Sequence, residues 1–98
     1  MTEEEFHHSL LLTAPPETLT LPLQALWWEA KGDWELSHRL AQEAQSREGD
    51  WVHAYLHRKE GDEGNASYWY QRAGRQMQVG SLDQEWSDMV GELLLLQS

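Results

Sequence analysis

The dipeptide Gly-Asp occurs at Gly32 and again at Gly61, two positions that lie 29 residues apart. At this offset small residues also coincide, as Ala25 with Ala54, Ser37 with Ala66, and Ala44 with Ala73. Gly-Asp is typical of a turn, and small residues are typical of places where two helices approach closely. The repeat therefore predicts one helix-turn-helix unit used twice. Such units must stack, because neither can bury its apolar face alone.

The spacing of apolar residues gives the extent of each element. Helical periodicity predicts two hairpins, at about 20–47 and 50–75, and a terminal helix at about 82–96 with a strongly apolar stripe. Residues 1–19 contain turn and extended-chain signals and are expected to form an irregular N-terminal arm. We therefore predict an all-α protein with a single helical-repeat domain over 20–98, built from two antiparallel hairpins and a C-terminal capping helix.

Residues that cap helices mark the expected starts. Thr20 is expected to cap the first helix, Asp50 the third and Asn65 the fourth. Ser81 with Gln84 three residues later is typical of a capping box at the start of the terminal helix.

Residues 32–44 and 61–73 resemble the turn and second helix of the tetratricopeptide repeat. In that family Gly-Asp opens the turn, and a small residue, an aromatic residue and an alanine follow at fixed positions. The matches are Ala66, Tyr70 and Ala73 in the second copy, and Ser37, Ala41 and Ala44 in the first, where the aromatic is lost. The resemblance implies stacked hairpins whose first helices line a concave peptide-binding groove. The period of 29 residues is shorter than the family's, which is about 34. The segment 51–62 is also similar to small bacterial proteins, a resemblance that implies no particular activity.

One face of the third predicted helix carries Trp51, Tyr55, Arg58 and Lys59. The resemblance places these positions on the groove. Arginine binds carboxylates with two parallel hydrogen bonds, and aromatic side chains provide large contact areas, so this face would suit an acidic peptide or protein. The alternative is that the two aromatics belong to the core and the two basic groups are merely solvated.

His53 and His57 lie four residues apart on the same helix, and Glu60 follows three residues later. This spacing puts three potential ligands of zinc or another divalent metal on one face. The favoured interpretation is a structural one. The repeat alignment puts both imidazoles on the side that packs against the partner helix, within reach of Tyr70 or a backbone carbonyl. We therefore predict no metal and no cofactor, with binding of a small ligand or divalent metal as the alternative.

The net charge of −10 argues against a nucleic-acid partner or an anionic membrane surface, both of which select basic proteins. The acidity is uneven, because residues 51–75 contain four basic and three acidic side chains. If the protein has a binding site, this nearly neutral, aromatic-rich segment is where we expect it.

Several classes of function lack their sequence signals. The chain has no cysteine, no glycine-rich phosphate loop and no serine in a Gly-x-Ser-x-Gly context, so we expect no enzymatic activity. The acidic N-terminus is unlike a signal peptide, and the apolar runs 10–12 and 93–96 are too short for a membrane span. These observations favour a cytoplasmic protein.

Adjacent aromatics at 27–28 and 68–70 point to different sides of their helices, so one hairpin core cannot bury them all. Exposed aromatics usually mark an interface, and we expect a homodimer through this aromatic surface or through the C-terminal helix. The alternative is that a small two-layer array uses both faces internally. The overall prediction is a non-catalytic module that binds a protein or peptide.

Overall fold

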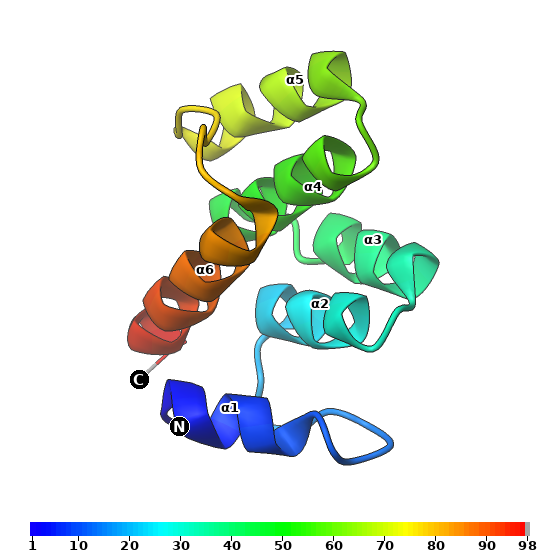
Figure 1. Ribbon diagram of the computed structural model, residues 1–98, viewed down its shortest axis with the longest axis vertical. Helices are drawn as coiled ribbons and strands as arrows, with labels where there is room; N and C mark the ends of the chain where they lie inside the picture. Colours follow the sequence, from blue (N-terminus) through cyan, green and yellow to red (C-terminus); the bar gives the residue numbers. More distant parts are fainter. Residues whose placement is uncertain (98) are drawn as a thin grey trace.

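The structure, a computed structural model that describes residues 1–97, is all-helical, and no strand occurs in that part of the chain (Figure 1). This confirms the predicted fold class. The helices are α1 (Glu3–Ser9), α2 (Leu21–Ala30), α3 (Trp34–Glu43), α4 (Arg47–Lys59), α5 (Glu63–Ala73) and α6 (Leu82–Gln97).

The two Gly-Asp turns have the same local structure. Gly32 and Gly61 have φ values of +91° and +85°, in the left-handed region that favours glycine. Asp33 and Asp62 then cap α3 and α5, because each carboxylate accepts a hydrogen bond from the backbone N–H three residues later. The cap of α5 is therefore Asp62 and not the predicted Asn65. The sequence repeat is thus a repeat of structure at both turns.

Small residues lie where α2 packs against α3 and where α4 packs against α5. The Ser37 hydroxyl donates a hydrogen bond to the carbonyl of Ala25 at 2.6 Å, which requires the two helices to be in close contact. The equivalent residues of the second copy, Ala54 and Ala66, are also fully buried. The predicted close approach at these positions is confirmed.

α4 begins earlier than predicted. Its N-cap is Ser46, which accepts a hydrogen bond from the N–H of Gly49 at 3.0 Å, so the expected cap at Asp50 is wrong. Gly49 is buried inside the first turn, and a Cβ there would lie 2.7 Å from both the Ala41 carbonyl and the Ala44 Cβ. This glycine therefore does not end a helix. It lets the start of α4 approach the end of α3.

The N-terminal segment is helical at its start, so the expectation of an irregular arm holds only for the residues after α1. Thr2 forms a capping box with the glutamate three residues later. Phe6 is fully buried, with its ring centroid 5.8 Å from that of Trp86. The hydroxyl of Ser9 accepts a hydrogen bond from the indole of Trp27 at 3.0 Å. α1 is thus part of the core, and it buries one of the surplus aromatics. The first residue of α2 follows Thr20, whose side chain makes no capping hydrogen bond.

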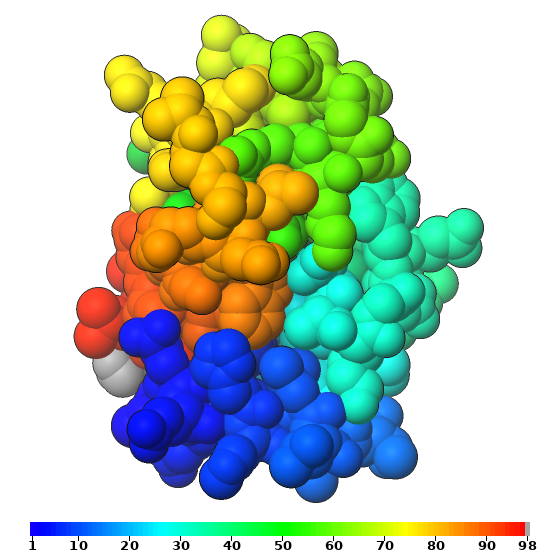
Figure 2. Space-filling model, in the orientation of Figure 1, coloured from blue at the N-terminus to red at the C-terminus, as the bar shows by residue number. Residues whose placement is uncertain are grey.

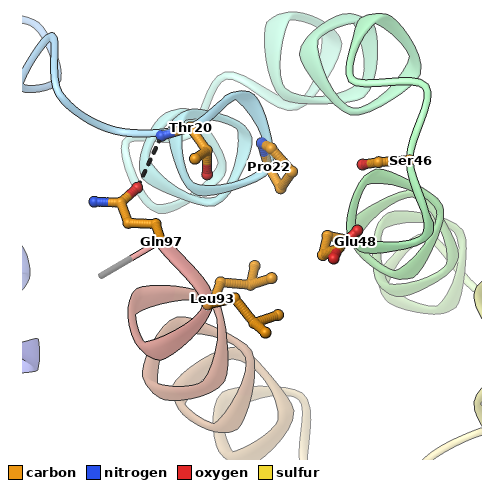
Figure 3. Close-up of a pocket in the computed structure, with 7 residues that line it drawn as sticks. Thr20, Pro22, Ser46, Glu48, Leu93 and Gln97 are labelled. Carbon is orange, nitrogen blue, oxygen red and sulfur yellow. Dashed lines mark hydrogen bonds between the residues drawn. The ribbon is translucent and has the colours of Figure 1, made fainter.

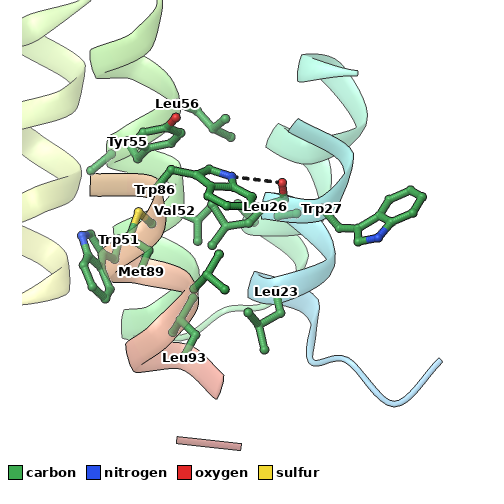
Figure 4. Close-up of a cluster of buried hydrophobic side chains, with 14 of the residues drawn as sticks. Leu23, Leu26, Trp27, Trp51, Val52, Tyr55, Leu56, Trp86, Met89 and Leu93 are labelled. Atoms are coloured by element: carbon green, nitrogen blue, oxygen red, sulfur yellow. Dashed lines mark hydrogen bonds between the residues drawn. The ribbon is translucent and has the colours of Figure 1, made fainter. Parts of the chain in front are cut away.

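α6 packs against α2 and α4, and also touches α1 (Figure 1). The indole N–H of Trp86 donates to the carbonyl of Leu26 at 3.3 Å, in the centre of the apolar core (Figure 4). Ser81 accepts from the N–H of Gln84 at 3.0 Å and caps α6, but the Gln84 side chain donates to Asp88, so the predicted capping box is only half formed. In the space-filling view α6, orange to red, lies above the blue α1 (Figure 2). A cap at the end of the array would stack on α5, whereas α6 covers the side formed by α2 and α4.

Candidate functional site

The structure separates the predicted site residues into two groups on opposite sides of α4. One group faces α6 or α2 and consists of Trp51, Tyr55, Arg58, Lys59 and, from α5, Tyr70. The other group is His53 and His57, which face α3 and α5.

Glu85 of α6 lies at the centre of the first group. Its side chain is buried, with only 1% of its surface exposed. Its two carboxylate oxygens accept hydrogen bonds from the Tyr70 hydroxyl at 2.6 and 2.8 Å. The guanidinium of Arg58 lies 2.8 Å from one oxygen, and the indole N–H of Trp51 lies 3.4 Å from the other. A buried carboxylate is costly unless it is both paired and hydrogen-bonded, and here both conditions are met. We call these four residues the carboxylate site.

The tyrosines near this site remain protonated. Burial raises the pKa of Tyr70, and its hydrogen bond to Glu85 raises the pKa further. Burial also raises the pKa of Tyr55, with additional contributions from Glu29 and Glu85. Tyr70 is therefore a hydrogen-bond donor to the carboxylate throughout the physiological pH range.

Two further ion pairs join the basic residues of this region to neighbouring helices. Lys59 pairs with Glu29 of α2. Arg75 pairs with Glu92 of α6, and its guanidinium lies 3.6 Å from the centroid of the Trp51 ring. The basic side chains of residues 51–75 thus pair with carboxylates of the acidic helix α6 and of α2.

The face predicted to bind a peptide is covered by the chain's own helix. Trp51 and Tyr55 are each 2% exposed, as the core interpretation predicted, while Arg58 is paired with Glu85 and not simply solvated. α6 is itself an acidic segment, and its Glu85 carboxylate contacts an arginine and two aromatic side chains.

The second group is completed by a residue that the sequence analysis missed. His38 of α3 lies beside His53 and His57, with ring centroids 4.4 and 5.4 Å away, and those two rings are 4.9 Å apart. Trp34 stacks on His38 at 4.8 Å, and Trp69 stacks on His53 at 3.9 Å. We call the three histidines the imidazole cluster. A tryptophan ring thus stacks on each of two members of the cluster.

The polar partners of these histidines differ from the predicted ones. The hydroxyl of Tyr70 contacts Glu85 and not an imidazole, because α5 directs that side chain toward α6. Nδ1 of His57 lies 2.5 Å from a carboxylate oxygen of Glu60. His57 and Glu60 therefore share a face as predicted. The predicted group of His53, His57 and Glu60 does not form, because Glu60 lies beside His57 and Asp62.

The environment of the cluster keeps its inner imidazoles neutral. Burial, together with smaller contributions from the neighbouring imidazoles and Arg72, lowers the pKa of His53 to about 3. Burial, followed by the effect of His57, also lowers the pKa of His38. At neutral pH both rings therefore have one nitrogen with an available lone pair, which is the form that binds metals.

The repeat gives no indication of His38, because its counterpart 29 residues later is Ser67. Only the packing of α3 against α4 brings His38 to the other two histidines. Its position four residues after Trp34 is the one local signal, since both then share a face of α3.

An open hollow near the end of α6 contains no comparable chemistry (Figure 3). It is lined by Thr20, Pro22, Ser46, Glu48, Leu93, Leu96 and Gln97. The amide oxygen of Gln97 accepts a hydrogen bond from the backbone N–H of Thr20 at 3.0 Å, so part of its polar lining is used internally.

No family model, curated protein or solved structure matches this chain. The resemblance to tetratricopeptide repeats therefore stays a prediction. None of the helices within residues 1–97 has the length and apolar character needed to traverse a lipid bilayer.

Proposed function

We propose that this protein is a non-catalytic interaction module that binds a carboxylate-bearing amphipathic helix on the face formed by α2 and α4. α6 is the resident occupant of that face. The observation that supports the proposal is the carboxylate site, in which Trp51, Arg58 and Tyr70 all direct polar atoms at one buried carboxylate.

α6 defines the pattern that a partner helix must reproduce. After the glutamate it buries an aromatic residue and then aliphatic residues at helical spacing: Trp86, Met89, Val90, Leu93 and Leu94. An amphipathic helix that lies in a groove is recognised by anchors at such spacings. The carboxylate adds specificity, because a helix without it would leave the Arg58 guanidinium and the Tyr70 hydroxyl without their partner.

The segment that connects α5 to α6 determines how readily a partner helix can replace α6. Residues 76–80 are all exposed, so the connection itself contributes little buried surface to holding α6 in place. A short connection nevertheless gives α6 an effective concentration on the order of millimolar. A partner helix therefore displaces α6 only if it makes contacts that α6 lacks or if the hold on α6 is weakened.

The test uses the full chain carrying Glu85→Gln, which keeps the side-chain size but removes the charge that holds α6. A fluorescent peptide of residues 80–97 with its native glutamate is the probe. Its anisotropy should rise saturably with this variant, and its affinity should be at least tenfold higher than for the unmodified chain. The same peptide with Glu85→Gln should bind at least tenfold more weakly, because it cannot supply the buried charge.

Two chain variants provide the controls. Adding Arg58→Gln should abolish the preference for the glutamate peptide, whereas adding Arg39→Gln, on the exposed side of α3, should leave it intact. Equal affinity for the two peptides, or no binding to the Glu85→Gln chain, would contradict the proposal.

A further inference from the structure

We propose that His38, His53 and His57 form a binding site for a divalent transition-metal ion that prefers imidazole ligands, zinc being the representative case. The three residues come from two helices, α3 and α4, and each offers one ring nitrogen. The three nitrogens all lie within 4.8 Å of one another. Neutral imidazole is the commonest metal ligand in proteins, and three of them are a donor set that suits zinc, copper or nickel.

The required adjustment is small. A tetrahedral zinc ion with Zn–N distances of about 2.1 Å holds its ligand nitrogens roughly 3.4 Å apart. The nitrogens must therefore approach one another by at most about 1.4 Å from the 4.8 Å limit. Rotation of His38 about its side-chain bonds provides part of this movement, since this ring is only partly buried.

Glu60 orients one of the ligands. Its carboxylate lies 2.5 Å from Nδ1 of His57, so Nδ1 is the nitrogen that donates to Glu60, and in the neutral ring Nε2 is then the metal ligand. A carboxylate on the distal nitrogen of a ligating histidine is the arrangement that fixes ring orientation and increases ligand basicity in zinc sites. The backbone also holds this turn, because the carbonyl of His57 accepts from the N–H of Asp62 at 2.9 Å.

The other two histidines have nitrogens to spare. Within residues 1–97 neither His38 nor His53 forms a side-chain hydrogen bond, whereas the buried Tyr70 and Glu85 on the other side of α4 are hydrogen-bonded to each other. No fully buried polar side-chain atom of the described chain lacks a partner, so the spare nitrogens retain access to solvent. Because His38 is only partly buried, the cluster is open to solvent at this residue.

The charges around the imidazole cluster favour a cation, because the acidic groups near it outnumber the basic ones. Glu60 and Asp62 lie next to His57, and the chain as a whole has a net charge of −10. The opposing group is Arg72, which lies over the Trp69 ring and is 3.7 Å from the carboxylate of Asp50. Three protein ligands leave the fourth position of a tetrahedral ion for water or an added ligand, which distinguishes this site from a closed structural one.

The decisive experiment is isothermal titration of Zn²⁺ alone into the full chain and its variants. We expect one ion per chain, and at least tenfold weaker binding for His38→Asn. Because His38 is partly exposed, this variant should fold normally, which circular dichroism checks. Glu60→Gln should weaken binding by about 10- to 100-fold, because it removes the group that orients His57.

The matched control is His8→Asn, since His8 is an exposed histidine on α1. It should bind zinc as tightly as the unmodified chain. As a second readout, zinc should raise the thermal unfolding midpoint of the unmodified chain and of His8→Asn but not of His38→Asn.

Imidazole ¹⁵N spectra give an independent check, because coordination should shift Nε2 of His57 and leave Nδ1 protonated. Equal zinc affinity for His38→Asn and the unmodified chain would overturn the site. Loss of binding in His8→Asn would move the ion to the N-terminus, and the absence of saturable binding would show that the cluster is an aromatic stack only.

Discussion

The hydroxyl of Tyr70 lies 2.6 and 2.8 Å from the two carboxylate oxygens of Glu85 and joins α5 to α6, although these helices do not pack on each other within the described chain. Arg58 of α4 meets the same carboxylate. One buried side chain of α6 is therefore shared by two helices of the second hairpin. This sharing fixes where α6 begins its path across the molecule.

Glu85→Ala should be strongly destabilising. It removes the hydrogen-bond acceptor of the Tyr70 hydroxyl and leaves the mostly buried Arg58 guanidinium with only the Gly80 carbonyl, and breaking such a pair typically costs about 3–5 kcal/mol. Urea denaturation followed by circular dichroism measures the free energy of unfolding. The control is Glu92→Ala, which breaks the more exposed pair with Arg75 and should cost less than about 1 kcal/mol. Equal costs would mean that the carboxylate site contributes no special stability.

Gly49→Ala should destabilise the protein even though alanine favours helices. Its Cβ would lie 2.7 Å from the Ala41 carbonyl and the Ala44 Cβ, so α3 and α4 must separate, at a cost of about 1–3 kcal/mol. Gly64→Ala in α5 is the comparison, since the nearest atom would be 3.9 Å away. That change should stabilise the protein by about 0.5–1 kcal/mol. Thermal unfolding of both variants should therefore show shifts of opposite sign.

Asp62→Ala should lower stability at neutral pH through loss of the N-cap of α5. Hydrogen bonds from the side chain and the backbone of Asn65 lower the pKa of Asp62 below its ordinary value of 3.8. The unfolded chain therefore takes up this proton more readily than the folded chain. The contribution of the cap is complete above pH 3.8 and is lost as the pH falls through the folded pKa. Denaturation at a series of pH values should show the variant and the parent converging at acid pH, and a constant difference would contradict this.

Phe6→Ala tests whether α1 belongs to the core. The ring is fully buried beside Trp86, and removal of a buried phenylalanine typically costs about 3–5 kcal/mol. Leu11, which is 86% exposed, provides the control, since Leu11→Ala should change the free energy of unfolding by less than about 0.5 kcal/mol. If Phe6→Ala were equally harmless, the N-terminal residues would be an arm after all.

The sequence predicted those parts of the fold that depend on local chemistry. Gly32 and Gly61 with their following aspartates specify two turns, and Ser37 with its counterpart specifies where helices touch. The start of α1 also had a local signal, the capping box of Thr2 and Glu5, which the prediction of an irregular arm did not use.

The parts that were not predicted depend on which helix faces which. The apolar stripe of α6 indicates that one side is buried, but it does not say that Trp86 reaches Leu26 on α2. His38 could not be connected to His53 for the same reason, because they meet only through the packing of α3 on α4. Glu85 is a buried charged residue at the start of α6 that bonds to both α4 and α5, and nothing in its local sequence sets it apart from the other acidic residues.

Contacts within the chain account for most of the aromatic side chains that predicted a dimer interface. Trp27 is buried against α1, Tyr70 at Glu85, and Trp69 rests on His53. Of the aromatics considered, Tyr68 is the one that is more than half exposed. Most of the aromatics that predicted an interface pack within the chain, which is what the alternative of a two-layer array predicts.

The most direct test of the central claim, that α6 covers the face of α2 and α4, is a nuclear Overhauser spectrum of the isotopically labelled chain. Cross-peaks should connect the Trp86 ring to Phe6 of α1 and to Leu26 of α2, because both lie in contact with it. Cross-peaks from Trp86 to Tyr68 or Trp69 of α5 in their place would put α6 at the end of the array, and would contradict both the carboxylate site and the proposed binding face.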